Sequence, residues 1–99
     1  MKNKDLSDLI ENAKSASEML KGLAHETRLL AICFIGAGEK NVQELVEYLG
    51  TTQANISQHL AKLRALDLLN NRKERNQVFY RVKDPATLKL VRALQNIYC

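Results

Sequence analysis

The sequence predicts one mainly α-helical domain that carries a small β-hairpin. Three observations support this fold class. Apolar residues recur at helical spacing over most of the chain, and the spacing changes to strand-like alternation only between residues 69 and 82. The chain has 99 residues, of which 45% are hydrophobic and 26% are charged, so it has room for a single core. We therefore treat residues 1–99 as one domain.

The first two helices are predicted from apolar spacing that ends at glycines. Apolar residues keep helical spacing from about Asp5 to Leu20, and Gly22 is the expected stop. A second helix is expected to begin near Ala24 and to end at the break over residues 36–38. Because this helix is apolar almost all round, we expect it to be the central, buried helix.

Two shorter elements follow and are joined by a tight turn. Asn41 is predicted to cap a helix over residues 42–49, with Glu44 as its capping-box partner. Thr52 is predicted to cap the next helix, over residues 52–64. Two helices joined by a turn of two or three residues that contains glycine are the signature of a helix-turn-helix.

The last third of the chain predicts a hairpin and a final helix. After Leu69 one strand rises to a polar tip over residues 74–77, and residues 78–82 return as a β-rich strand. Asp84 and Pro85 supply the N-cap and first position of a helix that extends to the end of the sequence. The resulting order, four helices, a two-stranded hairpin and a helix, is that of a winged helix-turn-helix.

The helix over residues 52–64 has one face that suits a DNA groove. Ile56, Leu60 and Leu63 form an apolar seam that must face inward. The opposite face is small or hydrogen-bonding and has no acidic residue, although an ordinary solvated helix can show the same pattern. Amides and hydroxyls can bond to base edges. The candidates for these contacts are Gln53, Ser57 and Gln58.

Positive charge is concentrated in the segment that follows. The net charge is +4, but residues 62–83 hold seven basic residues against two acidic ones. Such a stripe is the footprint of phosphate contact, although a solvated face is the commoner meaning of basic runs. The expected contacts with the DNA backbone are made by Thr52, Lys62, Arg72, Lys73, Arg75 and Gln77. Arg75 or Gln77, at the tip, is also expected to reach the minor groove.

Several other functions lack their sequence patterns. No apolar run approaches the roughly eighteen residues of a membrane span, and the amino end lacks the core of a secretory signal, so we expect a cytoplasmic protein. No CxxC, HExxH, EF-hand or glycine-rich phosphate loop is present, so we expect no metal and no cofactor. His25 and His59 are assigned to packing or capping. A thiol enzyme would need one of them as a general base, so we do not expect an enzyme.

The first and last helices carry more apolar residues than so small a core can absorb. We therefore expect them to pair with a second copy of the chain. Two-fold symmetry would place two recognition helices roughly 34–36 Å apart, on a pseudo-palindromic operator in double-stranded DNA. A winged helix that serves only in protein–protein contact is the alternative.

Four stretches of the chain resemble the ArsR/SmtB family of winged-helix transcriptional repressors. They read LAHETRL over 23–29, LVEYLG over 45–50, SQHLAKLR over 57–64 and VFY over 78–80. The resemblance covers nearly the whole chain and implies a DNA-binding repressor. Asp67 and Asn76 depart from the family, because both stand where its members usually have glycine. Asparagine tolerates a positive φ better than most residues, so we expect the turn of the wing to persist.

Within this family the two cysteines are most similar to those of one branch. Metal sensors of the family bind through a cysteine pair in the third helix or through Asp, His and Glu in the last, and both sets are missing here. The dithiol sensors of sulfide and oxidants, the BigR and HlyU type, have one cysteine in the second helix and one near the end of the last. Cys33 and Cys99 fall at these places.

The resemblance implies that oxidation or (per/poly)sulfidation of Cys33 and Cys99 switches operator affinity, with reactive sulfur species or oxidants as the inducer. A direct disulfide needs Cα atoms about 4.4–6.8 Å apart, and a wider gap favours a bridge with extra sulfur atoms. The alternatives are a metal-responsive or ligand-independent repressor. In these, Cys33 is only a buried small residue and Cys99 an exposed terminal one.

Overall fold

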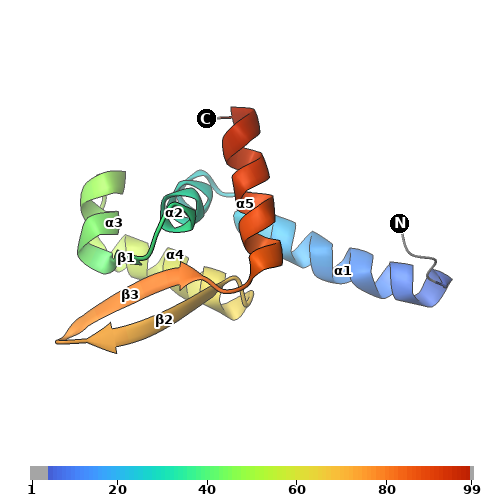
Figure 1. The fold of residues 1–99 in the computed structure, drawn as a ribbon, viewed down its shortest axis with the longest axis horizontal. Coiled ribbons are helices and arrows are strands. Elements are labelled where there is room, and N and C mark those ends of the chain that lie inside the picture. Colours follow the sequence, from blue (N-terminus) through green and yellow to red (C-terminus); the bar gives the residue numbers. More distant parts are fainter. Residues whose placement is uncertain (1–4, 99) are drawn as a thin grey trace.

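The computed structural model describes residues 5–98 and confirms the predicted winged helix-turn-helix architecture (Figure 1). The elements along the chain are α1 (Leu6–Leu23), α2 (Glu26–Gly36), β1 (Lys40–Asn41), α3 (Val42–Leu49), α4 (Gln53–Ala65), β2 (Leu69–Glu74), β3 (Gln77–Val82) and α5 (Pro85–Tyr98). Within the described residues, no helix is both long and apolar enough to cross a membrane.

The helix-turn-helix is formed by α3 and α4, with the predicted caps. The Asn41 side chain accepts a hydrogen bond from the Glu44 amide at 2.8 Å, and the Glu44 carboxylate accepts one from the Asn41 amide at 3.0 Å. Gly50 ends α3 with a φ of 65°, a left-handed conformation that favours glycine. Thr52 Oγ1 then accepts from the Asn55 amide at 3.1 Å and so caps α4.

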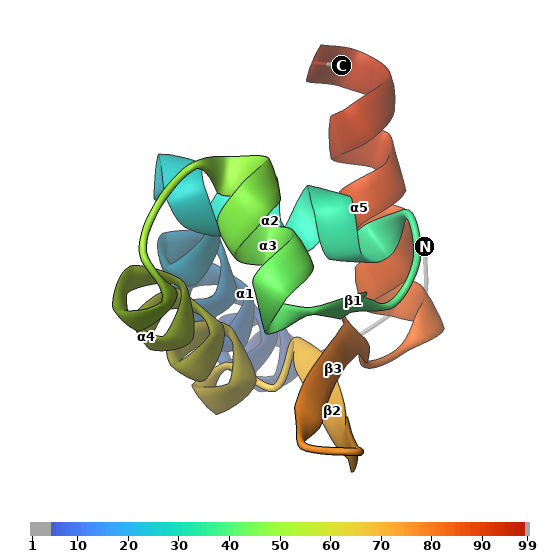
Figure 2. The same ribbon diagram turned by 90° about the vertical axis from the view of Figure 1, so that its left-hand side faces the viewer.

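The sheet that contains the hairpin has one more strand than the sequence predicted. β2 and β3 form the expected antiparallel hairpin, and its turn holds Arg75 and Asn76 at φ values of 49° and 68°. β1 adds to the other edge of β3, so the strand order is β1-β3-β2. The two-stranded prediction was therefore wrong in strand number, because a strand of two residues is too short to show alternation. Figure 2 shows this small sheet below α3 and beside α5.

The core lies where α2, α3 and α4 meet. Ile56, Leu60 and Leu63 are fully buried, which confirms the inward seam predicted for α4. Leu45 of α3 and Ile32 of α2 are also fully buried and belong to the same cluster. Apolar burial of this kind fixes the outward face of α4 relative to the wing.

α2 is buried along one face only, although its sequence predicted burial all round. Ala31, Ile32 and Ile35 are buried, whereas Leu30 is 45% exposed. α3 and α5 cover the second face only in part, and this face lines an apolar cavity. The carboxyl end of α2 packs tightly on α5, since a Cβ on Gly36 would lie 2.7 Å from a methyl group of Val91.

α1 projects from the rest of the molecule as an arm (Figure 1). Its apolar residues Leu6 and Ile10 are 72% and 59% exposed. Only its carboxyl end reaches the core, where Met19 packs against it and Leu23 is buried. Gly22 does not stop this helix as predicted, because α1 continues to Leu23. Gly22 is instead buried against Leu66, where a side chain would collide with a methyl group.

Candidate nucleic-acid interface and thiol site

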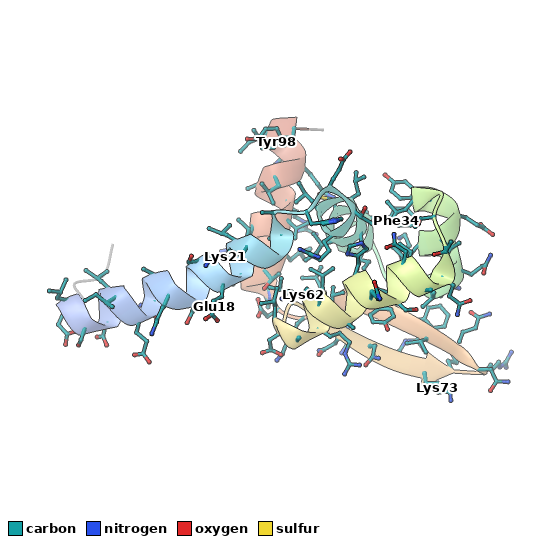
Figure 3. All side chains as sticks on the ribbon, turned by 180° about the vertical axis from the view of Figure 1, so that it is seen from behind. Glu18, Lys21, Phe34, Lys62, Lys73 and Tyr98 are labelled. Carbon is teal, nitrogen blue, oxygen red and sulfur yellow. The ribbon has the colours of Figure 1, made fainter. Side chains whose placement is uncertain are left out.

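α4 lies beside the hairpin of β2 and β3, which forms the wing (Figure 3). Lys62 marks the carboxyl-terminal part of α4 in this view, and Lys73 lies on the wing below it. The candidates for base contact, Gln53, Ser57 and Gln58, are all exposed. The structure therefore leaves these side chains accessible beside an exposed β-hairpin.

An uncharged groove of about 360 Å³ connects the start of α4 with the wing. Its lining residues are Asn41, Val42, Gln43, Gln53, Asn76, Gln77 and Val78. The side-chain Nδ2 of Asn41 donates a hydrogen bond to Gln77 Oε1 at 3.1 Å, so the wing is connected to the cap of α3. The structure thus brings Gln53 and Gln77 to one groove. Gln43, which sequence reasoning did not single out, joins them through tertiary structure that no local pattern shows.

Arg72 is held by two carboxylates. Its Nη2 lies 2.7 Å from Glu39 Oε1, and its Nη1 lies 2.5 Å from Glu74 Oε2. Its guanidinium carbon also lies 4.6 Å from the ring centre of Phe79. The hydrogen bonds that Arg72 donates to Glu39 and, to a smaller extent, to Glu74 raise the pKa of Arg72, and the bond accepted from Arg72 lowers the pKa of Glu39. The charge of this predicted phosphate ligand is therefore compensated within the wing.

The other basic side chains of residues 62–83 fall into two groups. Lys83 forms an ion pair with Asp67, at 2.5 Å. Asp67 has a φ of 64°, so it adopts the left-handed conformation that glycine favours. The basic residues of the segment that are exposed and form no ion pair within residues 5–98 are Lys62, Arg64, Lys73, Arg75 and Arg81. These five residues carry the positive charge of residues 62–83 that no ion pair in the described chain compensates.

The two histidines meet at the junction of α1, α2 and α4. His25 Nδ1 accepts a hydrogen bond from the Thr27 amide at 3.2 Å and caps α2. The His25 and His59 rings lie 4.5 Å apart between centroids, and His59 Nδ1 lies 3.4 Å from Arg28 Nη1. Arg28 also donates to the carbonyl of Gly22. Both histidines therefore have the packing or capping roles expected of them, and the position of α4 is connected to the ends of α1 and α2.

The environment of His59 disfavours its protonated form. Desolvation is the largest cause, and the neighbouring His25 and Arg28 act in the same direction, so the pKa of His59 lies below its ordinary value of 6.5.

Among residues 5–98, no three His, Cys, Asp or Glu side chains come together in a group able to hold a metal ion.

Cys33 lies in the wall of an apolar cavity of about 450 Å³. The cavity is lined by Leu29, Leu30, Cys33, Phe34, Ala37, Tyr48, Leu94, Gln95 and Tyr98, from α2, α3 and α5. Gln95 of α5 donates a hydrogen bond to the Cys33 carbonyl at 2.8 Å, which fixes α5 against this part of α2. The predicted second thiol, Cys99, lies outside the described residues. Tyr98, which precedes Cys99 in the sequence, contributes to the same cavity as Cys33.

These features together define a winged helix-turn-helix regulator of transcription. Residues 25–71 match the family described as "Bacterial regulatory protein, arsR family". The chain is 35% identical over 92 residues to the biofilm growth-associated repressor of Xylella fastidiosa (strain Temecula1), covering 93% of this chain and 81% of that protein. It is 36% identical over 95 residues to the transcriptional activator HlyU of Vibrio cholerae, covering 96% and 88%. The chain therefore belongs to the ArsR family of bacterial regulatory proteins.

A solved structure agrees with this assignment. The fold matches that of reduced HlyU from Vibrio cholerae N16961 with a TM-score of 0.90 and 36% sequence identity, over 95% of this chain and 99% of the other. The family confirms the resemblance seen in the sequence. It also identifies the protein as a transcriptional regulator and not an enzyme.

Proposed function

We propose that this protein is a dimeric DNA-binding repressor whose operator affinity is switched by oxidation or (per/poly)sulfidation of Cys33 and Cys99. One observation gives the switch its main support. Cys33 and Tyr98, the residue before Cys99, line one cavity although 65 positions of the sequence separate them. A bridge between the two thiols would join α2 to the end of the chain.

The DNA-binding part of the proposal rests on the exposed face of α4 and the wing. Gln53, Ser57 and Gln58 read base edges, because an amide bonds bidentately to adenine and a hydroxyl to several bases. The phosphate contacts of the proposal are Thr52, Lys62, Lys73, Arg75 and Gln77, with Arg72 joining them where its ion pair with Glu39 opens. Arg75, at the turn of the wing, enters the minor groove.

A dimer is supported by the apolar residues that the protomer leaves uncovered. Among the described residues, six of the eight exposed large apolar side chains lie on the first and last helices. They are Leu6, Leu9, Ile10 and Leu20 on α1 and Ile97 and Tyr98 on α5, and they are 45–79% exposed. An apolar surface of this kind on an extended arm is typical of a self-association face. In the proposed dimer, the α1 and α5 faces of two copies cover one another with two-fold symmetry.

The sign of regulation is part of the proposal. One relative is named a repressor and another an activator. We propose repression: the reduced dimer occupies a pseudo-palindromic operator and blocks the promoter, and modification of the thiols releases it.

The proposed thiol chemistry balances for two classes of inducer. With a hydroperoxide, the Cys33 thiolate attacks the terminal oxygen to give a sulfenic acid and an alcohol. The Cys99 thiol then displaces water to form the disulfide. With an inorganic polysulfide, Cys33 takes one sulfur atom to give a persulfide, and the polysulfide is shortened by that atom. Attack of Cys99 on the inner sulfur releases hydrogen sulfide, and a second sulfur transfer before closure leaves an extra sulfur in the bridge.

The fold connects this bridge with the recognition helix. α2 carries Cys33, and at its other end Arg28 contacts His59 of α4. A bridge that displaces α2 therefore changes the support of α4 and the spacing of the two recognition helices in the dimer. A coupling of about 1–3 kcal/mol, usual for allosteric proteins, corresponds to roughly a 5–150-fold loss of operator affinity.

Operator binding tests the proposal directly. A duplex is selected in vitro with the reduced protein, and affinity is measured by fluorescence anisotropy before and after treatment with inorganic polysulfide, and again after reductant. We expect a 5–150-fold loss that the reductant reverses. Because the chain has only two cysteines, Cys33→Ser, Cys99→Ser and the double variant isolate the switch. An affinity that polysulfide leaves unchanged, or an equal response in the double variant, would contradict the proposal.

A further inference from the structure

The cavity beside Cys33 has an uncharged and largely apolar wall. No charged residue lines it, and its polar side chains are those of Cys33, Gln95 and two tyrosines. Phe34 and Tyr48 form one side as a stacked pair, with ring centroids 3.8 Å apart and planes inclined by 4°. Figure 3 marks Phe34 on α2 and Tyr98 at the end of α5. A thiol in such a wall is surrounded by the surface that apolar molecules prefer.

The size of the cavity suits a small organic molecule. Its volume of about 450 Å³ lies within the range of roughly 300–1,000 Å³ that is typical of ligand sites. The cavity opens beside Tyr48, which is 56% exposed. Entry of a charged reagent would be unfavourable, because the reagent would lose its hydration and no lining residue would compensate its charge.

We infer that this cavity binds small, uncharged aryl hydroperoxides and makes Cys33 selective for them over hydrogen peroxide. The ring of the hydroperoxide lies against the apolar wall, and its peroxide group faces the Cys33 sulfur. The thiolate attacks the terminal oxygen, the O–O bond breaks, and a proton from solvent completes the leaving alcohol. Cys33 is oxidised to sulfenic acid and the peroxide is reduced.

This inference rests on the reactivity of Cys33 in the proposed function, but selectivity is measured separately from DNA release. The full-length Cys99→Ser variant is treated with cumene hydroperoxide or with hydrogen peroxide in the presence of dimedone, and intact mass gives the rate of sulfenic acid trapping. The ratio of the two rates is compared with the same ratio for free cysteine. We expect the protein ratio to be at least about tenfold higher, because burial of an aromatic ring favours the organic peroxide.

A variant in which a larger side chain fills the cavity tests the inference. Ala37 is exposed at the end of α2 and lines the cavity, so Ala37→Phe places a ring in it. We expect the ratio of the two rates to fall in this variant to the value for free cysteine. Ala86→Phe, an equal change at an exposed position outside the cavity, should keep the ratio of the unfilled cavity. Equal ratios for both variants, or a protein ratio equal to that of free cysteine, would overturn the inference.

A second measurement depends neither on folding of a variant nor on thiol chemistry. Cumyl alcohol, the unreactive product, should shift the NMR signals of the Phe34 and Tyr48 rings. Absent shifts, as expected where a second copy of the chain already covers the cavity, would overturn the inference. Selective modification that leaves the operator affinity of the unsubstituted protein unchanged would instead remove the proposed switch and leave the cavity site standing.

Discussion

Arg72 in the wing and Glu39 before β1 form a two-point ion pair, with Arg72 Nη2 2.7 Å and Nε 3.0 Å from the two carboxylate oxygens. The residues are 33 positions apart, so the pair connects β2 to the segment that enters the helix-turn-helix. Both side chains are substantially exposed, and an exposed pair adds little to global stability. The consequence of this ion pair is local, since it compensates a positive charge in the wing of the proposed DNA interface.

The salt dependence of DNA binding should therefore differ between neighbouring basic residues. Lys73 forms no ion pair within the described chain, so Lys73→Ala should lower the slope of log K against log salt by about 1. Arg72→Ala should lower it less, because Glu39 and Glu74 compensate its charge. Glu39→Gln should steepen the slope by freeing Arg72. Equal slope changes for Lys73→Ala and Arg72→Ala, on random duplex DNA, would refute this reading.

Gln58 is expected to determine sequence preference and not general affinity. Gln58→Ala removes an exposed amide and no charge, so it should relax specificity at one base pair by about 1–3 kcal/mol and leave the salt slope unchanged. The measurement compares the operator with single-base variants and with random DNA. Lys62→Ala, a change on the same helix, serves as a control that weakens binding to all sequences. Equal losses on operator and random DNA for Gln58→Ala would contradict the assigned role.

Stability should depend on the protonation of His59. Its folded pKa lies below 6.5 because of desolvation, His25 and Arg28, so the unfolded chain binds more protons between the two values. The contribution of His59 to the free energy of unfolding is therefore fully present above pH 6.5, and it is lost as the pH drops through the folded pKa. Denaturant titrations over this range should show the decrease, and His59→Gln should reduce it. An unchanged pH profile in the variant would remove His59 as its source.

Dimer formation should depend on the exposed face of α1. Ile10 is 59% exposed in the protomer, and Ile10→Lys places a charge where the proposed interface needs an apolar side chain. We expect the dimer to weaken by at least about tenfold, since burial of one isoleucine contributes about 1.5–3 kcal/mol. Sedimentation velocity measures the change. Asn12→Lys, an exposed substitution of the same charge two residues away, controls for charge and helix propensity. Equal dissociation of both variants would contradict the α1 interface.

Much of the fold follows from signals that are local in sequence. The Asn41 and Glu44 capping box, the Thr52 cap and the buried seam of α4 were all predicted, because each depends on residues three or four positions apart. The departures Asp67 and Asn76 proved to adopt the left-handed conformation that their position demands. Local chemistry was sufficient at these positions.

The features that sequence did not predict depend on contacts between distant segments. β1 exists only because residues 40 and 41 pair with residues 80 and 79. Gly22 was read as a helix stop, but its role is to allow close approach of Leu66. The compensation of Arg72 by Glu39, and the cavity at Cys33, likewise require the folded arrangement. For the candidate site, sequence identified the residue types but not which charges remain uncompensated.

The central claim is that a covalent bridge between Cys33 and Cys99 controls operator binding. Intact mass spectrometry and anisotropy on the same polysulfide-treated sample test it most directly. We predict a protein that has lost two hydrogen atoms, with or without added sulfur, whose Cys33 and Cys99 peptides are joined and whose operator affinity falls in proportion to the bridged fraction. Reductant should reverse both changes. A sample in which bridged and reduced protein bind the operator equally well would contradict the account.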